Sequence, residues 1–150
     1  MARYAFKAQD TASTSTACAA LVSDATRPRR SKIYDLILSS EATPADAVMF
    51  WKIQRSTTAP TATAVTPRPL DPADAATETD AYENSTSDGT LTADVFLLEI
   101  AVNQRATFRW VAAPGGELVI PATASNGVHY IFASPTPGSV VTATTHFEEQ

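Results

Sequence analysis

The two histidines are the first residues to test for chemistry, because imidazole binds metals and exchanges protons near neutral pH. His129 lies in VHYIFA and His146 in TATTHFEEQ, and neither has a histidine or cysteine nearby at metal-ligand spacing. Zinc and iron sites usually combine at least three such ligands. We therefore expect both histidines to be ordinary strand residues, and we expect no metal and no cofactor.

Serine and cysteine nucleophiles are also poorly supported. The sequence has no G-x-S-x-G elbow and no phosphate-binding G-x-G or G-K-[ST] pattern. Ser125 precedes Asn126-Gly127 and is expected to be a turn residue. Cys18 is the only cysteine, so an internal disulfide is excluded, and its small neighbours predict a buried thiol. No catalytic residue is predicted, and the chain is not expected to be an enzyme.

Three acids, Asp71, Asp74 and Glu78, offer a carboxylate cluster of the kind that a hydrolase or a calcium site uses. They lie in DPADAATETDAYE, where Asp71 fits a helix N-cap and Pro72 fits the first helical position. Acids in the first turn also stabilise the helix dipole. The sequence therefore predicts one short helix here, with capping favoured over a carboxylate site.

The charges are unevenly distributed. The net charge is −5, and residues 71–100 contain eight acids and no base. The only basic cluster is RPRRSK, residues 27–32. It fits either an acidic partner surface or the protection of a strand edge. The charge polarity fits head-to-tail contact between copies, or simply solvated loops. Nucleic acid is not expected as a partner, because the overall charge would repel it.

Three aromatic residues, Trp51, Trp110 and Tyr130, suggest a different class of function. A row of such rings can stack on sugars, so a carbohydrate-binding module is the alternative hypothesis. Residue alternation predicts instead that both tryptophans lie in the core with the other large side chains.

Strands are expected where β-branched and aromatic residues alternate with a period near two. The expected ranges are Arg3–Lys7, Lys32–Ser39, Ala47–Arg55, Ala93–Val102, Arg105–Ala112, Glu117–Ile120, Val128–Ala133 and Ser139–Phe147. The loop SSEATPAD predicts that the second and third of these pair as an antiparallel hairpin. Pro114-Gly115-Gly116 and Asn126-Gly127 are expected to form tight turns. Antiparallel strands with a single helix indicate an all-β sandwich or barrel.

The length of 150 residues is typical of one domain. We expect residues 1–25 to be an amino-terminal arm or first strand, and residues 26–150 to be a single β-sandwich domain. No apolar run approaches the roughly 20 residues that cross a bilayer. The amino terminus lacks the apolar segment of a secretory signal. We expect a soluble protein made in a cytoplasm, with no membrane partner.

Three parts of the sequence carry a resemblance to known proteins. They are RRSKIYDLILSSEATPAD, the pair WKIQRSTT and TAVTPRPLDPADAATET, and above all NQRATFRWVAAPGGELVIPATASNG. These blocks resemble small virion structural proteins of tailed bacteriophages. The resemblance covers about residues 27–150. It implies a β-sandwich of the jelly-roll kind and a non-enzymatic role in the particle.

The nearest role implied by this resemblance is that of a head decoration or cement protein. Such a protein lies on the capsid surface of the virion, binds the major capsid protein and is often a trimer. A tail or baseplate component is the alternative within the same class. No functional residue is carried over, because the matching blocks are structural. We expect the amino-terminal segment and the early proline-rich loops to make the capsid contacts.

Overall fold

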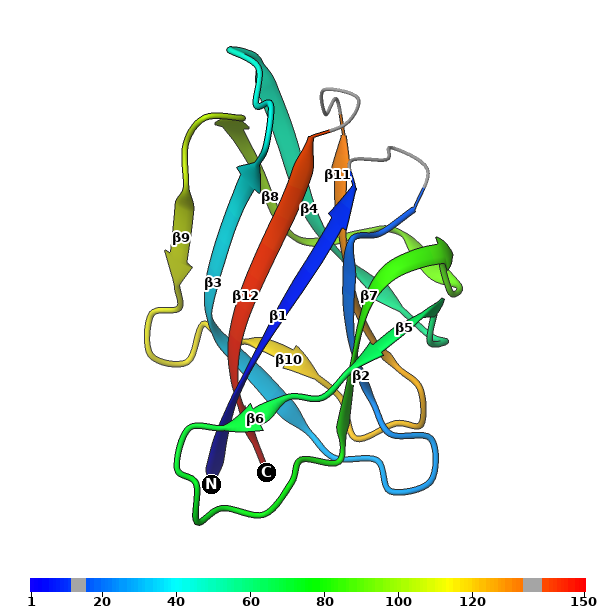
Figure 1. The fold of residues 1–150 in the computed structure, drawn as a ribbon. Helices are drawn as coiled ribbons and strands as arrows, with labels where there is room; N and C mark the ends of the chain where they lie inside the picture. Colours follow the sequence, from blue (N-terminus) through cyan, green and yellow to red (C-terminus); the bar gives the residue numbers. More distant parts are fainter. Residues whose placement is uncertain (12–15, 134–138) are drawn as a thin grey trace.

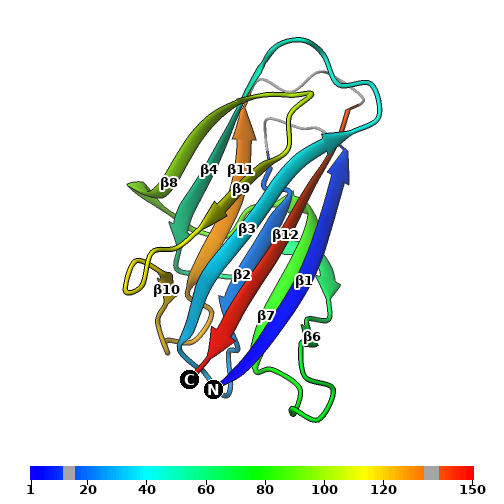
Figure 2. The ribbon, with the colours of Figure 1, turned by 90° about the vertical axis from the view of Figure 1, so that its left-hand side faces the viewer.

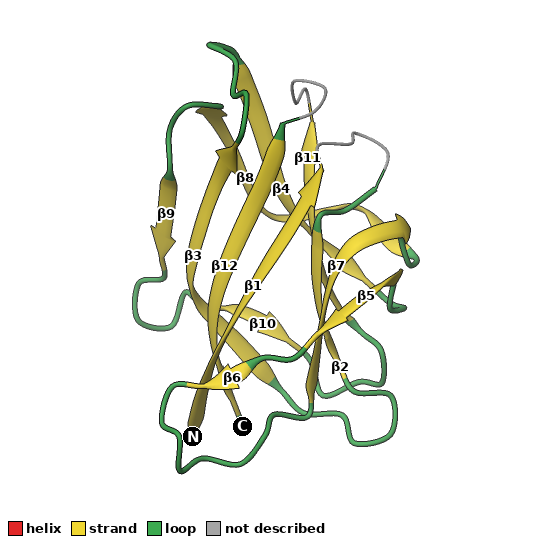
Figure 3. Cartoon of the chain, in the orientation of Figure 1, coloured by secondary structure: helices red, strands yellow, loops and turns green. Residues whose placement is uncertain are grey.

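The computed structural model describes residues 1–11, 16–133 and 139–150, which form strands, turns and loops but no helix (Figures 1 and 3). The strands are β1 (Ala2–Thr11), β2 (Ala19–Ser23), β3 (Ser31–Glu41), β4 (Val48–Ser56), β5 (Thr61–Val65), β6 (Arg68–Pro69), β7 (Thr79–Ser87), β8 (Leu91–Asn103), β9 (Phe108–Val111), β10 (Leu118–Ile120), β11 (Gly127–Ala133) and β12 (Val140–Glu149). The predicted all-β class is confirmed.

The strands form two antiparallel sheets that pack face to face (Figure 2). Sheet A has the order β10-β3-β12-β1-β6, and β9 pairs with β3 on the same edge as β10. Sheet B has the order β5-β7-β2-β11-β4-β8. Both chain ends lie at one end of the sandwich, beside each other (Figure 1), because β1 and β12 pair along their whole length.

Eight of the strands follow the order of a jelly roll. Without the additional strands β5, β6, β7 and β10, sheet A runs β1-β12-β3-β9 and sheet B runs β2-β11-β4-β8. The first of the eight strands therefore pairs with the last, and the second pairs with the seventh. This is the connectivity of two Greek keys that defines the jelly roll. The β-sandwich implied by the sequence is confirmed.

The core fills the space between the sheets, because alternate side chains of each strand point inward. In β4, Met49, Trp51 and Ile53 are at most 1% exposed. Tyr130 and Phe132 of β11 pair with Ile53 and Trp51 and share their face. The rings of Trp51 and Phe132 lie 5.6 Å apart. Burying each such side chain contributes about 1.5–3 kcal/mol to the free energy of unfolding.

Residues 57–90, between β4 and β8, close one side of the sandwich. Here β6 adds to sheet A beside β1, while β7 and β5 add to sheet B beside β2. We call this the closed side. On the opposite side, which we call the open side, sheet B ends at β8 and sheet A ends at β9 and β10. Figure 2 shows the open side.

A carboxylate near the carboxyl terminus fastens the closed side. Oε2 of Glu149 in β12 accepts hydrogen bonds from Oγ1 of Thr77 at 2.6 Å, Oγ1 of Thr79 at 2.7 Å and the backbone N of Glu78 at 3.0 Å. These contacts join sheet A to the first residue of β7 in sheet B and to the two residues before it. Hydrogen bonds to a charged acceptor are stronger than neutral ones, so Glu149 holds the two sheets together at this end.

The expected hairpin of Lys32–Ser39 with Ala47–Arg55 is wrong. The first range lies in β3 of sheet A, where it pairs with β12, and the second lies in β4 of sheet B, where it pairs with β11. The loop between them crosses from one sheet to the other. Alternation shows that each strand has one apolar face, but two such strands can lie side by side or face each other across a core.

The expected helix after Asp71 is also wrong. Oδ1 of Asp71 accepts a hydrogen bond from the N of Ala73 at 2.9 Å, so the cap forms, but the chain makes only one turn. It then enters β7, where Thr79 and Ala81 are 2% exposed. The unpaired edge of β2 provides backbone partners along β7, and this tertiary pairing overrides the local helical preference.

Smaller differences concern turns and strand ends. Gly115 has a φ of 81°, as expected of the Pro114-Gly115-Gly116 turn. Asn126-Gly127 joins β10 of sheet A to β11 of sheet B and is not a hairpin turn; Ser125 carries the positive φ of 60° there. Gly127 is needed for close packing, since a Cβ would lie 2.2 Å from the O of Leu21. Strand β9 begins three residues later than expected.

The amino-terminal segment is built into the sandwich. Residues 1–25 contain β1, an internal strand of sheet A, and β2, an internal strand of sheet B; residues 12–15 lie outside the described part of the chain. The two strands have hydrogen-bonded neighbours on both edges. This segment is therefore not a detached arm, and its removal would take a strand from each sheet.

Candidate functional site

His146 belongs to a charge cluster on the outer face of sheet A that sequence analysis missed. Its Nδ1 lies 3.1 Å from Oδ2 of Asp35. Nε and NH2 of Arg109 donate to the two oxygens of the same carboxylate at 2.9 and 2.8 Å. These hydrogen bonds hold the pKa of Asp35 below its usual range. The cluster ties β3 to β9 and β12; the sequence signal was an acid inside the apolar run KIYDLILS.

His129 is in a different environment, sealed under the segment that leads into β8. Its side chain is fully buried, and its Nδ1 lies 4.0 Å from Oδ1 of Asp88. That oxygen accepts a hydrogen bond from the N of Ala17 at 2.8 Å. Burial lowers the pKa of His129, with Asp88 opposing the shift. A ring that is enclosed in this way cannot reach a substrate, so His129 is a packing residue.

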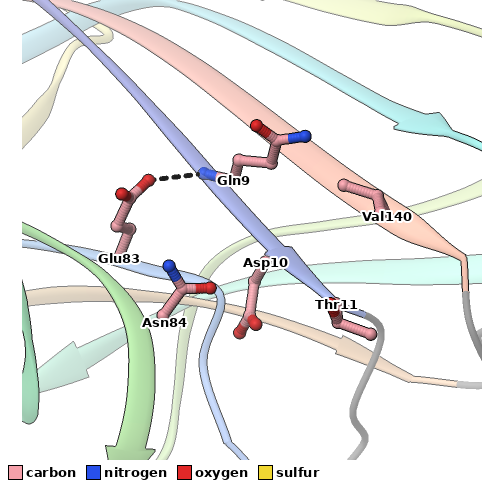
Figure 4. A pocket seen from close by; sticks show the side chains of 6 residues that line it. All are labelled: Gln9, Asp10, Thr11, Glu83, Asn84 and Val140. Atoms are coloured by element: carbon pink, nitrogen blue, oxygen red, sulfur yellow. Dashed lines mark hydrogen bonds between the residues drawn. The ribbon is translucent and has the colours of Figure 1, made fainter.

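A polar depression of about 250 Å³ lies beside the end of β1 (Figure 4). It is lined by Gln9, Asp10, Thr11, Glu83, Asn84 and Val140. Oε2 of Glu83 accepts from the N of Gln9 at 2.9 Å, and the amide nitrogen of Asn84 lies 3.0 Å from Oδ1 of Asp10 in the orientation that satisfies both groups. Burial, reinforced by Glu83, raises the pKa of Asp10 to about 6.

This depression lacks the composition of a metal or catalytic site. Its two carboxylates already accept hydrogen bonds from the protein. Across the described residues, no three His, Cys, Asp or Glu side chains are grouped so that they could hold a metal ion. Asp71, Asp74 and Glu78 do not project from a helix as expected, because the helix is absent.

The basic and acidic segments singled out in the sequence meet within one molecule. NH1 of Arg27, in RPRRSK, lies 2.8 Å from Oε1 of Glu78. Oδ1 of Asp24 accepts from the N of Thr26 at 2.7 Å and the N of Arg27 at 2.6 Å, which orders the loop between β2 and β3. Part of the charge polarity is thus neutralised internally. Arg29 and Arg30 remain exposed beside it.

The aromatic platform of the carbohydrate-binding alternative is not formed. Trp51 is 1% exposed and Tyr130 is fully buried, where its hydroxyl accepts a hydrogen bond from Oγ1 of Thr145 at 3.0 Å. Trp110 is half-buried and packs against the core. The prediction that the tryptophans belong to the core is confirmed for Trp51 and holds in part for Trp110.

The two nucleophile candidates are also structural. Cys18 is fully buried, as predicted, and burial raises the pKa of its thiol well above the usual value. A protonated, inaccessible thiol is a poor nucleophile. Ser125 lies in the turn before β11, where its N donates to the O of Ser23 at 3.0 Å.

The open side is an apolar region that these elements leave incompletely covered. Phe108 and Trp110 of β9 share a face with the buried Leu38 and Leu36 of β3, yet they are only half-buried. Across from them, the inward-facing residues of β8 are also half-buried, namely Leu98, Ile100 and Val102. Val95, Phe96 and Val111 are 38%, 40% and 59% exposed. This side therefore has the character of an interaction surface.

Comparison with known proteins finds distant structural likeness alone. No family model matches the sequence, and no curated protein matches it. A structure of Desmodium yellow mottle tymovirus aligns with 97% of this chain and 83% of its own chain, at 11% identity and a TM-score of 0.37. The decameric BFDV capsid protein aligns with 98% of this chain and 94% of its own, at 12% identity and a TM-score of 0.34. At such low TM-scores neither structure bears on the function.

The described residues contain no helix that is long and apolar enough to cross a bilayer. The accessible features of the described residues include the open side, the loops at the two ends and the polar depression near Asp10. Such surfaces can bind other macromolecules.

Proposed function

We propose that this chain is a structural component of a tailed-bacteriophage virion, specifically a capsid decoration protein that binds the lattice of the major capsid protein. The proposal rests on the resemblance of residues 27–150 to small virion proteins and on the jelly-roll sandwich. The observation that carries it is the filled core, in which Trp51, Tyr130 and Phe132 are at most 1% exposed. A sandwich filled in this way acts through its outer surfaces.

A decoration protein stabilises a shell by mass action. A ligand that binds only the mature lattice lowers the free energy of that state by its binding free energy. Many copies on one shell add these contributions through avidity. No cofactor or catalytic residue is needed for this role.

The lattice contact is expected at the proline-rich connection around β6 and not at the amino-terminal segment. Leu70 is 51% exposed there and follows the two-residue strand that pairs with β1. An exposed leucine on a loop fixed at both ends can bind an apolar pocket with little loss of conformational entropy. Truncation of residues 1–25 would remove β1 and β2 and is therefore not a clean test of binding.

The proposal is tested by counting copies of this chain in purified virions of the source virus, using mass spectrometry with isotope-labelled peptides. A number comparable with the major capsid protein is expected. A small, ring-like number would assign the chain to the tail or baseplate, and absence from the particle would overturn a structural role.

A second experiment tests the contact itself. Purified protein is added to shells that lack it, and co-sedimentation is measured for the wild type and for Leu70→Asp. The substitution is expected to weaken binding at least about tenfold, because a carboxylate would have to be buried. Thr66→Asp places the same charge earlier in the same connection and is the matched control.

A further inference from the structure

Strand β8 is a long edge strand with one edge unpaired. It spans Leu91–Asn103, pairs with β4 along one edge and ends sheet B, so no strand of the described chain lies against its other edge. The other strands at sheet edges are short: β5 has five residues, β9 has four, β10 has three and β6 has two. A long edge with free backbone N–H and C=O groups is a template for a further strand.

The first half of β8 is irregular, since its register with β4 shifts twice, but the residues of its second half do not protect the edge. Natural edge strands are usually blocked by lysine, proline or an inward-pointing charge. LTADVFLLEIAVN contains no lysine and no proline, and its Glu99 is paired with Lys52 of the neighbouring strand at 3.5 Å. From Leu98 to Asn103 the register with β4 is uninterrupted, so this stretch is a regular strand. The edge is therefore suited to pairing.

The charges around β8 select the partner and its direction. Asp94 is exposed near the beginning of the strand, and Arg105 is exposed two residues after its end. When a second copy runs antiparallel to the first, the Asp94 end of each strand lies near the Arg105 end of the other. The pair therefore contains two such contacts between opposite charges. A parallel arrangement would place like charges together. The other edge strands of the described chain are shorter than β8, whereas another β8 presents the same regular stretch, Leu98–Asn103, for pairing.

We propose that two copies of this chain pair through antiparallel β8 edges about a two-fold axis, which joins their sheets B into one continuous sheet. The half-buried Leu98, Ile100 and Val102 would then lie beside the same residues of the partner. The contact is isologous and closes at two subunits. This pairing differs from the trimer that the virion resemblance implies, and it does not depend on the proposed binding to a capsid.

Hydrogen exchange at two protein concentrations tests the edge directly. Analytical ultracentrifugation first gives the dimer dissociation constant, and deuterium uptake is then measured well above and well below it. The amides of β8 are expected to exchange at least about tenfold more slowly in the dimer, because pairing protects edge N–H groups. Those of β5, at the opposite edge, should not change. Equal uptake in β8 at the two concentrations overturns the proposal, as does a chain that stays monomeric or forms a trimer.

A charge exchange tests the direction. Asp94→Lys and Arg105→Glu are each expected to raise the dissociation constant about tenfold, and the double variant should restore it to within about threefold. Asp94→Asn removes the acid at a position whose φ of 57° asparagine accepts, so it serves if the lysine variant folds poorly. Arg29→Glu makes the same charge change as Arg105→Glu away from β8. A double variant as weak as the single ones overturns the antiparallel arrangement.

Discussion

Residues 57–90 close one side of the sandwich, whereas the other side has no such segment. On the closed side, β6 extends sheet A and β7 extends sheet B, and the contacts of Glu149 join the two sheets. On the open side, β8 and β9 end the sheets with half-buried and exposed apolar residues. Both sides begin from edge strands of the same jelly roll, so the difference lies in what the chain adds to them.

The inward-facing residues near the two sides differ in burial. Next to the closed side, Phe6 of β1 and Leu21 of β2 are at most 4% exposed. Next to the open side, Phe108, Trp110 and Ile100 are only half-buried. The added strands of the closed side cover its apolar side chains, whereas the open side leaves apolar area that another molecule can cover.

Paired core truncations are the strongest test of this difference. Leu21→Ala, in β2, removes a fully buried side chain and is expected to lower the free energy of unfolding by about 3 kcal/mol. Leu98→Ala, in β8, removes a half-buried one and should cost about 1 kcal/mol. Urea denaturation at low protein concentration measures both values. Equal losses would show that the open side is packed as well as the closed side.

Removal of the Glu149 carboxylate should loosen the closed side selectively. Glu149→Ala abolishes the hydrogen bonds from Thr77, Thr79 and the N of Glu78, and we expect a loss of about 2 kcal/mol. Glu99→Ala removes an exposed ion pair on β8 and should cost at most about 0.5 kcal/mol. Thermal unfolding compares the two variants. A similar small shift for both would contradict the role given to Glu149.

Acid should lower the free energy of unfolding through the buried His129. Its pKa in the folded state lies below the unfolded value of about 6.5, so the unfolded chain binds the proton first. The contribution of the neutral ring to the free energy of unfolding is complete above about pH 6.5. Between that pH and the folded pKa it falls by up to about 1 kcal/mol per pH unit. In His129→Gln, this contribution to the pH dependence of the free energy of unfolding should disappear. An unchanged slope between pH 7 and pH 5 would exclude it.

Asp10 should give a smaller effect of the opposite sign. Its folded pKa of about 6 lies above the unfolded value, so its carboxylate is disfavoured in the folded state at pH 7. Asp10→Asn is expected to stabilise the protein by up to about 1 kcal/mol at pH 7, an amount reduced by solvent screening. The difference should vanish at about pH 3 and below, where the aspartate is largely protonated in both states. A variant less stable than the wild type at pH 7 would contradict this assignment.

Candidate site residues were less predictable from the sequence than the strands. Cys18 and Trp51 are buried because their local patterns require it, and both were predicted. The pairing of Asp35 with Arg109 and His146 was missed, because these residues are 74 and 111 positions from Asp35. The free edge of β8 was also invisible, since a strand pattern does not show whether a neighbour will lie on both edges.

The sequence alone determined the all-β class, most of the strands and the positive-φ turn at Gly115. Period-two alternation and glycine chemistry act over a few residues, so these features can be inferred locally. Tertiary structure decided that β3 and β4 lie in different sheets and that β7 is a strand and not a helix. It also decided which side of the sandwich is closed. Alternation assigns a face to each side chain, but the hydrogen-bonding neighbour of a strand depends on packing between residues distant in the chain.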